Sequence, residues 1–367
     1  MKKRIQKWNA AVIIILALLI AALFLLIMDL TTFLVRSVVT MPGYGATLVS
    51  ELVAVAYVMV VLVVLGYHKI LQEKGEGFLR GFYIGGFMTA YCIYEVFGQF
   101  YLQRMAKAEA QPFFYILMFI AAVFLIGFNE EIVFRGIILN LFLDKFGNSK
   151  KGILTSTILS GVIFGAVHLT NIFSGVSVGS ATIQAVEAAL LGILFAQIYL
   201  RSGNIWITVI VHALTDFASM LPSGIYGAGN AVDTINKLSA INFIAIPVFL
   251  IPVLVLFRKN KLEELVQKRN GVAVMPSEAE CEHTAIVSLI LGIISITMSC
   301  MGYGLAFGVV GILGAYIALK DGGKKSGMII AGFVTSAVGI AISVIAVAFM
   351  LCLMPEMAGT DILRRSL

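Results

Sequence analysis

The chain has 367 residues, of which 60% are hydrophobic and only 13% carry a charge. Soluble domains contain about 45–50% apolar and about 25% charged residues, and a soluble domain of this length has no interior large enough for so many apolar side chains. The composition therefore indicates a polytopic membrane protein and excludes disordered, collagen-like and disulfide-rich secreted chains. The four Cys residues form no CxxC pair, and we expect them to be small buried hydrophobes.

A transmembrane helix needs about 20 mostly apolar residues. Eleven segments satisfy this requirement, at residues 9–32, 45–66, 81–103, 112–131, 153–170, 179–200, 204–221, 238–257, 284–301, 304–319 and 327–352. The first contains an uncharged run from Asn9 to Met28, which is too long for the core of a signal peptide, and no small-residue cleavage site follows it. We expect a retained helix there.

The positions of the basic residues predict the orientation. Nineteen of the 26 Lys and Arg residues fall on the same side of the predicted spans as the N-terminus, six fall on the other side, and Arg135 lies within a helix. Because cytoplasmic loops are enriched in Lys and Arg, we expect an integral plasma-membrane protein with a cytoplasmic N-terminus. The net charge of +6 then reflects topology, and no nucleic-acid partner is predicted.

The longest polar stretch, residues 258–283, predicts a cytoplasmic linker. It would divide the chain into a core at 1–257 and a C-terminal membrane domain of unknown function at 284–367. The fold class predicted is all-α: an eight-helix bundle followed by a three-helix tail. The tail is rich in Gly and contains Ser at intervals, a composition typical of closely packed membrane helices.

Ionisable side chains within spans are costly and suggest function by default. The candidates are Glu51, Glu95, Glu130, Glu131, Arg135, His168, Glu187, His212 and Asp216. Three of them, Glu51, Glu95 and Glu187, stand alone in the sequence. We expect those to be protonated or hydrogen-bonded structural carboxyls.

The sequence Glu130-Glu131-Ile-Val-Phe-Arg135 has the pattern EExxxR. Glu131 and Arg135 are four residues apart on a helix, which favours a salt bridge and leaves Glu130 free. Alternatively, Arg135 serves only to neutralise a buried acid.

Two further pairs are also spaced for one helical face: Phe164 with His168, and His212 with Asp216. Gly161 and Gly165 would let a neighbouring helix approach the helix that carries His168. The glutamates and His168 lie at similar distances from the turn that joins their helices, about 24 Å at the rise of an α-helix. The three motifs are therefore expected in one layer.

Two carboxylates, two imidazoles and an Asp, without a nucleophilic Ser or Cys in the pattern, favour activation of water. A buried Glu is suited to act as general base, and an imidazole to hold the water or to donate to an oxyanion. Zinc held by Glu130, His168 and His212 is a second route. The HExxH motif of soluble zinc proteases is absent, so the sequence supports a hydrolytic reaction more strongly than it supports a bound metal.

EExxxR, FxxxH and HxxxN or HxxxD on successive membrane helices resemble the motifs of the CAAX-processing and bacteriocin-processing proteases, the CPBP or Abi (Rce1-type) family. The segment from Leu191 to Trp206 also looks like the family's approach to its third motif. The resemblance covers about residues 110–220. It implies an intramembrane endopeptidase that hydrolyses membrane-associated proteins or peptides, which reach the site from the bilayer or the cytosol.

Carried over by this resemblance, Glu130 would be the base and His168 would position the water. Arg135 would hold Glu131, while His212 and Asp216 would support the oxyanion or a metal. Eukaryotic members have Asn where this chain has Asp216, and a carboxylate is a poor oxyanion donor unless protonated. The role expected for Asp216 therefore shifts toward orienting His212 or binding metal.

Two other functions were weighed. A non-catalytic membrane partner, such as a bacteriocin self-immunity or scaffolding protein, would retain the fold without the reaction. A transporter would use Glu51, Glu95 and Glu187 as a proton path, but inverted repeats and broken helices are not evident in the sequence.

Overall fold

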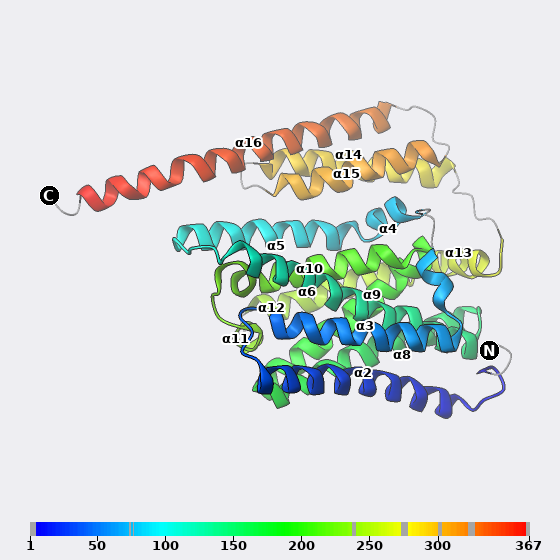
Figure 1. The fold of residues 1–367 in the computed structure, drawn as a ribbon. Helices are drawn as coiled ribbons and strands as arrows, with labels where there is room; N and C mark the ends of the chain where they lie inside the picture. The colour runs from blue at the N-terminus through cyan, green and yellow to red at the C-terminus, as the bar shows by residue number, and fades with distance from the viewer. Residues whose placement is uncertain are drawn as a thin grey trace. The chain divides into compact units, whose positions relative to one another are not determined.

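The computed structural model describes residues 5–72, 75, 77–236, 240–272, 278–299, 303–321 and 327–364. These residues form helices and connecting turns without a β-strand (Figure 1). The prediction of an all-α polytopic membrane protein is confirmed. The chain forms two compact units, one of Met1–Gly81 with Gln99–Val274 and one of Phe82–Gly98 with Met275–Leu367.

The first unit contains most of the helices. Their bounds are α2 Ala10–Val38, α3 Gly45–Leu65, the 3₁₀ helix η1 His68–Gln72, α6 Phe113–Glu131, the π-helix η2 Ile132–Leu139, α7 Asn140–Phe146, α8 Lys150–Val167, the 3₁₀ helix η3 His168–Ser174, α9 Val178–Ser202, α10 Ile205–Tyr226, α11 Ala231–Asn236, α12 Ala240–Leu256 and α13 Lys259–Arg269. Helices α4 (Phe78–Ile84) and α5 (Gly86–Met105) are each divided between the units.

Eight helices of the described chain are long and apolar enough to cross a membrane, and Gly304–Lys320 is a shorter apolar helix. Eight of the eleven expected spans coincide with these helices, and the span expected at 304–319 coincides with the shorter one. The predicted span 81–103 is interrupted between α4 and α5, and α5 carries polar residues such as Glu95 and Gln99. The predicted span 238–257 becomes the 17-residue helix α12, which contains two prolines.

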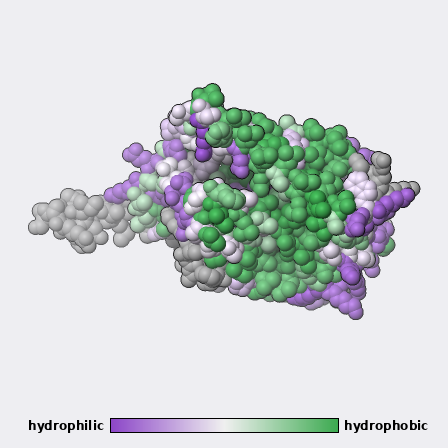
Figure 2. Space-filling view, turned by 90° about the horizontal axis from the view of Figure 1, so that it is seen from below, coloured by the Kyte–Doolittle hydropathy of each residue, from purple (hydrophilic) through white to green (hydrophobic). Residues whose placement is uncertain are grey.

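The outer face of the first unit suits contact with lipid. Helix α2 exposes large apolar side chains along its whole length, among them Ile15, Leu19, Leu26 and Phe33. The face in Figure 2 is largely apolar, with hydrophilic residues toward its ends. An apolar band with polar margins is the surface that a bilayer requires.

Side-chain caps fix where several helices begin. The side chains of Asn9, Ser149, Ser177 and Asn204 accept backbone N–H groups at the starts of α2, α8, α9 and α10. These contacts satisfy donors that a helix leaves unpaired in its first turn. Gly203 ends α9 at a φ of 73°, so α10 begins after a connection of only two residues.

Helices α8 and α9 pack with almost no space between their backbones. A Cβ on Gly165 would lie 2.3 Å from the carbonyl oxygen of Ala185, and one on Gly192 would lie 2.9 Å from the Cα of Gly161. The prediction that Gly161 and Gly165 admit a close neighbour is confirmed. The approach also positions α9 beside the Phe164 ring, which is 3.0 Å from the Cβ that Gly192 lacks.

The predicted linker 258–283 contains a helix of the first unit, and its residues 273–277 lie outside the described part of the chain. Arg201 at the end of α9 donates to the carbonyls of Leu256 and Lys261, at 2.7 and 3.0 Å. Arg269 donates to Asn148 before α8 at 3.0 Å. Helix α13 thus fastens the polar ends of α8 and α9.

The second unit contains residues 82–98 and the helices α14 (Glu278–Thr297), α15 (Gly304–Lys320) and α16 (Gly327–Arg364). Buried serines donate between helices, Ser288 to the carbonyl of Gly311 at 2.6 Å and Ser299 to that of Gly339 at 2.9 Å. The expected small-residue packing is confirmed. The domain bounds 1–257, 258–283 and 284–367 stay a prediction; the compact units differ from them at 82–98 and 258–274.

We expect Gly165→Ala to lower the free energy of unfolding by about 1–3 kcal/mol, because the added methyl group meets backbone atoms that have nowhere to move. Thermal melting of the purified protein in detergent measures the change. Gly179→Ala is the matched control, since no atom lies within 4 Å of the Cβ it adds to α9. Equal melting temperatures for the two variants would contradict the packing argument.

Candidate active site

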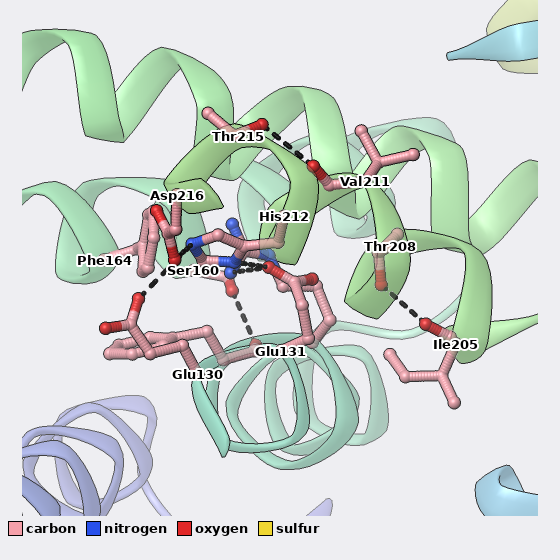
Figure 3. Close-up of polar contacts among 12 residues, drawn as sticks. Glu130, Glu131, Ser160, Phe164, Ile205, Thr208, Val211, His212, Thr215 and Asp216 are labelled. Carbon is pink, nitrogen blue, oxygen red and sulfur yellow. Dashed lines mark hydrogen bonds and ion pairs between the residues drawn. The ribbon is translucent and has the colours of Figure 1, made fainter. Parts of the chain in front are cut away.

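The three predicted motifs meet in the first unit, where α6 and η2, α8 and α10 come together (Figure 3). Glu130 and Glu131 end α6, His168 follows α8, and His212 and Asp216 lie on α10. The figure shows the His212 imidazole between the two glutamates. The depth argument from the sequence therefore predicted the correct grouping.

Glu131 is the centre of a buried ionic network. Its Oε1 atom lies 2.8 Å from Nη1 of Arg135 and 2.7 Å from Nδ1 of His212, and the Glu131 and Arg135 side chains are fully buried. The predicted salt bridge is confirmed. A carboxylate has only acceptor atoms, so Nδ1 of His212 carries the proton and donates to Glu131.

Arg135 is enclosed by aromatic rings. Its guanidinium carbon lies 4.3 Å from the centre of the Phe164 ring and 5.3 Å from that of Phe195. Phe195 also stacks on His212, with 5.3 Å between ring centres. Cation–π contacts of this kind favour a desolvated guanidinium, and the two rings fix the planes of both cationic groups.

The other nitrogen of His212 faces two more acids. Nε2 lies 3.6 Å from Oε2 of Glu130 and 3.6 Å from Oδ2 of Asp216. The Glu130 and Asp216 side chains are 24% and 23% exposed, whereas Glu131 is completely enclosed. The site therefore has a closed side that holds His212 and an open side where two carboxylates flank Nε2.

His168 approaches the same layer from α8. Its Nδ1 lies 2.8 Å from the carbonyl oxygen of Phe164, so Nδ1 donates and Nε2 is left as an acceptor. The Phe164 ring contacts both imidazoles edge-on, at 5.0 Å from His168 and 5.7 Å from His212. Phe164 is thus the spacer that sets the positions of the two imidazoles and Arg135.

A π-helix follows immediately after the glutamates. Its wider turn changes the positions of the backbone carbonyls, and side chains donate to three of them. Ser160 donates to that of Phe134 at 2.9 Å, and Asn140 donates to those of Arg135 and Gly136 at 3.1 and 2.9 Å. Single wide turns of this type recur at functional sites. The sequence reading missed this feature, since no residue pattern distinguishes it from an ordinary helix.

One further part of the site was not anticipated. Phe195 lies in the segment that resembles the family, but its contacts with Arg135 and His212 depend on how α9 is rotated.

Glu51 of α3 accepts a hydrogen bond from Asn129, the residue before Glu130, as expected for a hydrogen-bonded buried carboxyl. Asp216 lies 3.6 Å from His212 and Glu131 lies 2.7 Å from it. The role expected for Asp216, in orienting His212 or binding a metal, stays a prediction.

The side chains do not form a metal site as they are arranged. Within the described residues, three His, Cys, Asp or Glu side chains are nowhere grouped as a bound metal would require. Nδ1 of each imidazole is engaged in a hydrogen bond, so only the two Nε2 atoms remain for a ligand. The zinc set expected from the sequence, Glu130, His168 and His212, stays a prediction.

The site lies within a segment that matches a known family. Residues 112–218 match the family model described as type II CAAX prenyl endopeptidase Rce1-like. No curated protein and no solved structure matches the chain significantly. The resemblance seen in the three motifs is confirmed over this segment, which includes all three of them.

We expect Arg135→Met to destabilise the protein by about 3–5 kcal/mol, because it removes the permanent positive charge from the buried Glu131 carboxylate and leaves only His212 beside it. Adding Glu131→Gln should recover a large part of this loss, since the pair is then neutral. Melting temperatures of the single and double variants test the assignment. A single variant as stable as the wild type would show that the ion pair is not required.

Proposed function

We propose that the protein is an intramembrane endopeptidase that hydrolyses peptide bonds of membrane-associated proteins or peptides by glutamate-activated and histidine-activated water. The observation that carries this proposal is the placement of His212 between two carboxylates with different environments. One carboxylate, Glu131, is paired with Arg135 and buried; the other, Glu130, is partly exposed and lies 3.6 Å from Nε2 of His212.

Glu131 determines what the second nitrogen of His212 does. With the proton of Nδ1 donated to Glu131, Nε2 accepts in the neutral ring and donates in the imidazolium. The carboxylates of Glu130 and Asp216 face Nε2 and favour the imidazolium form electrostatically. His212 is then a preorganised donor to the oxyanion that forms on the scissile carbonyl.

Glu130 is the proposed general base. The 3.6 Å gap between its Oε2 and Nε2 of His212 is too long for a direct hydrogen bond, which leaves the carboxylate able to accept from a water. In the proposed reaction the water donates one proton to Glu130, and Nε2 of His168, which is left as an acceptor, helps to hold it. Its oxygen attacks the carbonyl carbon, Glu130 takes the proton, and the same proton passes to the amine that leaves when the C–N bond breaks.

The substrate reaches the site from the bilayer or the cytosol. The basic residues support a cytoplasmic N-terminus in the plasma membrane, with the polar ends of α8 and α9 and helix α13 on the cytoplasmic side. Cleavage of a membrane-associated chain near that side is compatible with the partial exposure of Glu130 and Asp216.

We expect Glu130→Gln to reduce cleavage at least 10²-fold, because the amide cannot take the proton of the attacking water. The measurement compares the N-termini of membrane proteins in cells that express the wild type, Glu130→Gln or no protein. N-termini present only with the wild type identify substrates and the cleaved bond.

Glu187→Gln is the matched control for this comparison. It also removes an intramembrane carboxyl, on α9, whose Oε1 is buried without a hydrogen-bond partner among the described residues. If wild type and Glu130→Gln give the same N-termini at equal abundance, the proteolytic function is wrong, and an immunity or scaffolding role with the same fold becomes the better proposal.

A zinc-dependent reaction with Glu130, His168 and His212 as ligands is the alternative mechanism. Because those side chains are not grouped as a metal site, we expect 1,10-phenanthroline and EDTA to leave the cleavage rate unchanged within about twofold. Complete loss on chelation, with recovery on adding Zn²⁺, would instead support the metal-dependent mechanism.

A further inference from the structure

Glu51 lies beside the site although it belongs to none of the three motifs. It is on α3, outside the segment that matches the family, and only 2% of it is exposed. Its carboxyl is hydrogen-bonded to Asn129, which directly precedes Glu130. A buried acid within a membrane helix is costly unless it has a compensating contact or use.

The compensating contact comes from Asn129. Its Nδ2 donates to Oε2 of Glu51 at 2.8 Å and to the backbone carbonyl of the same residue at 2.9 Å. Both amide protons are therefore directed at one residue of α3. Asn129 is fully buried, and its Oδ1 has no hydrogen-bond partner in the described structure. The side chain is oriented by Glu51 alone.

The position of this contact in the helix matters. Asn129 immediately precedes Glu130, and the π-helix begins two residues after Glu130. π-helices are rare and frequently occur at functional sites, so contacts from other helices to this segment bear on the site. Ser160 of α8 holds the segment through the Phe134 carbonyl at 2.9 Å, and Glu51 of α3 holds it at the glutamate end.

We propose that Glu51 is a positioning residue for proteolysis: through Asn129 it fixes the end of α6 and thereby the placement of Glu130 against His212. This inference rests on the proposed proteolytic function. The expected effect of this contact on the cleavage rate is large, because a displacement of a catalytic group by about 1 Å lowers the rate by up to about 10²-fold. Glu51 itself takes no part in the proton transfers.

The test uses the full-length protein in detergent and a peptide that spans a bond identified by the N-terminal comparison. We expect Asn129→Asp to lower kcat at least about tenfold while KM changes less than about twofold, because the new carboxylate cannot donate to Glu51. Glu51→Gln keeps an acceptor for Asn129 and should remain within about threefold of the wild type.

The double variant Glu51→Gln/Asn129→Asp reverses the polarity of the contact, since the Gln amide then donates to the Asp carboxylate. We expect it to recover most of the kcat lost in Asn129→Asp. All variants preserve side-chain size, so each remains a fair test if a truncation to Ala fails to fold. Glu187→Gln is the control for the loss of an intramembrane carboxyl elsewhere.

The outcomes separate this inference from the function on which it rests. If Glu130→Gln is inactive but Asn129→Asp has a wild-type kcat, or the double variant is no better than Asn129→Asp, the positioning role is wrong and proteolysis stands. A fall in melting temperature with kcat unchanged assigns the contact to stability alone and also overturns it. If the wild type shows no Glu130-dependent cleavage, both proposals fail.

Discussion

The site depends on one carboxylate oxygen, Oε1 of Glu131, which contacts groups on two helical segments. Oε1 of Glu131 contacts Arg135 at 2.8 Å and His212 at 2.7 Å, in an interior where unpaired charge is strongly disfavoured. Because Arg135 neutralises the acid and His212 shares it, the network links α6 and the π-helix to α10. The aromatic rings of Phe164 and Phe195 cover the guanidinium, so the charges lie in a cage with few other polar partners.

The asymmetry of the adjacent glutamates follows from this arrangement. Glu131 is enclosed and contacts both Arg135 and Nδ1 of His212, whereas Glu130 is 24% exposed and faces Nε2 of the same imidazole. Two acids that are neighbours in the chain thus have separate roles because they reach one ring from its two sides. The same division explains why a base at Glu130 and a donor at His212 are compatible within one small site.

The backbone around the site is held by packing that leaves little freedom. The missing side chains of Gly161, Gly165 and Gly192 bring α8 and α9 together, which places Phe164 and Phe195 on either side of Arg135. All of this chemistry lies in the first unit. The second unit is built on serine-to-carbonyl hydrogen bonds and glycine contacts, and it includes residues 82–98, which are inserted in the sequence of the first.

The sequence by itself determined the membrane class, most of the spans and the grouping of the three motifs. The length of each hydrophobic run, the distribution of basic residues and the i,i+4 spacing can all be read from the sequence, and they do not depend on how the helices pack. The Glu131–Arg135 ion pair could be predicted from the sequence for the same reason, since its partners lie on one helical face.

Tertiary structure alone decided which atoms meet across helices. The pairing of His212 with Glu131, the stacking of Phe195 and the contact of Glu51 with Asn129 depend on helix rotation and crossing, for which the chain has no short-range signal. The π-helix after Glu131 depends likewise on a carbonyl whose hydrogen-bond partner, Ser160, comes from another helix. Spacing along one helix is fixed by its geometry, whereas contacts between helices are fixed by the packing of the whole bundle.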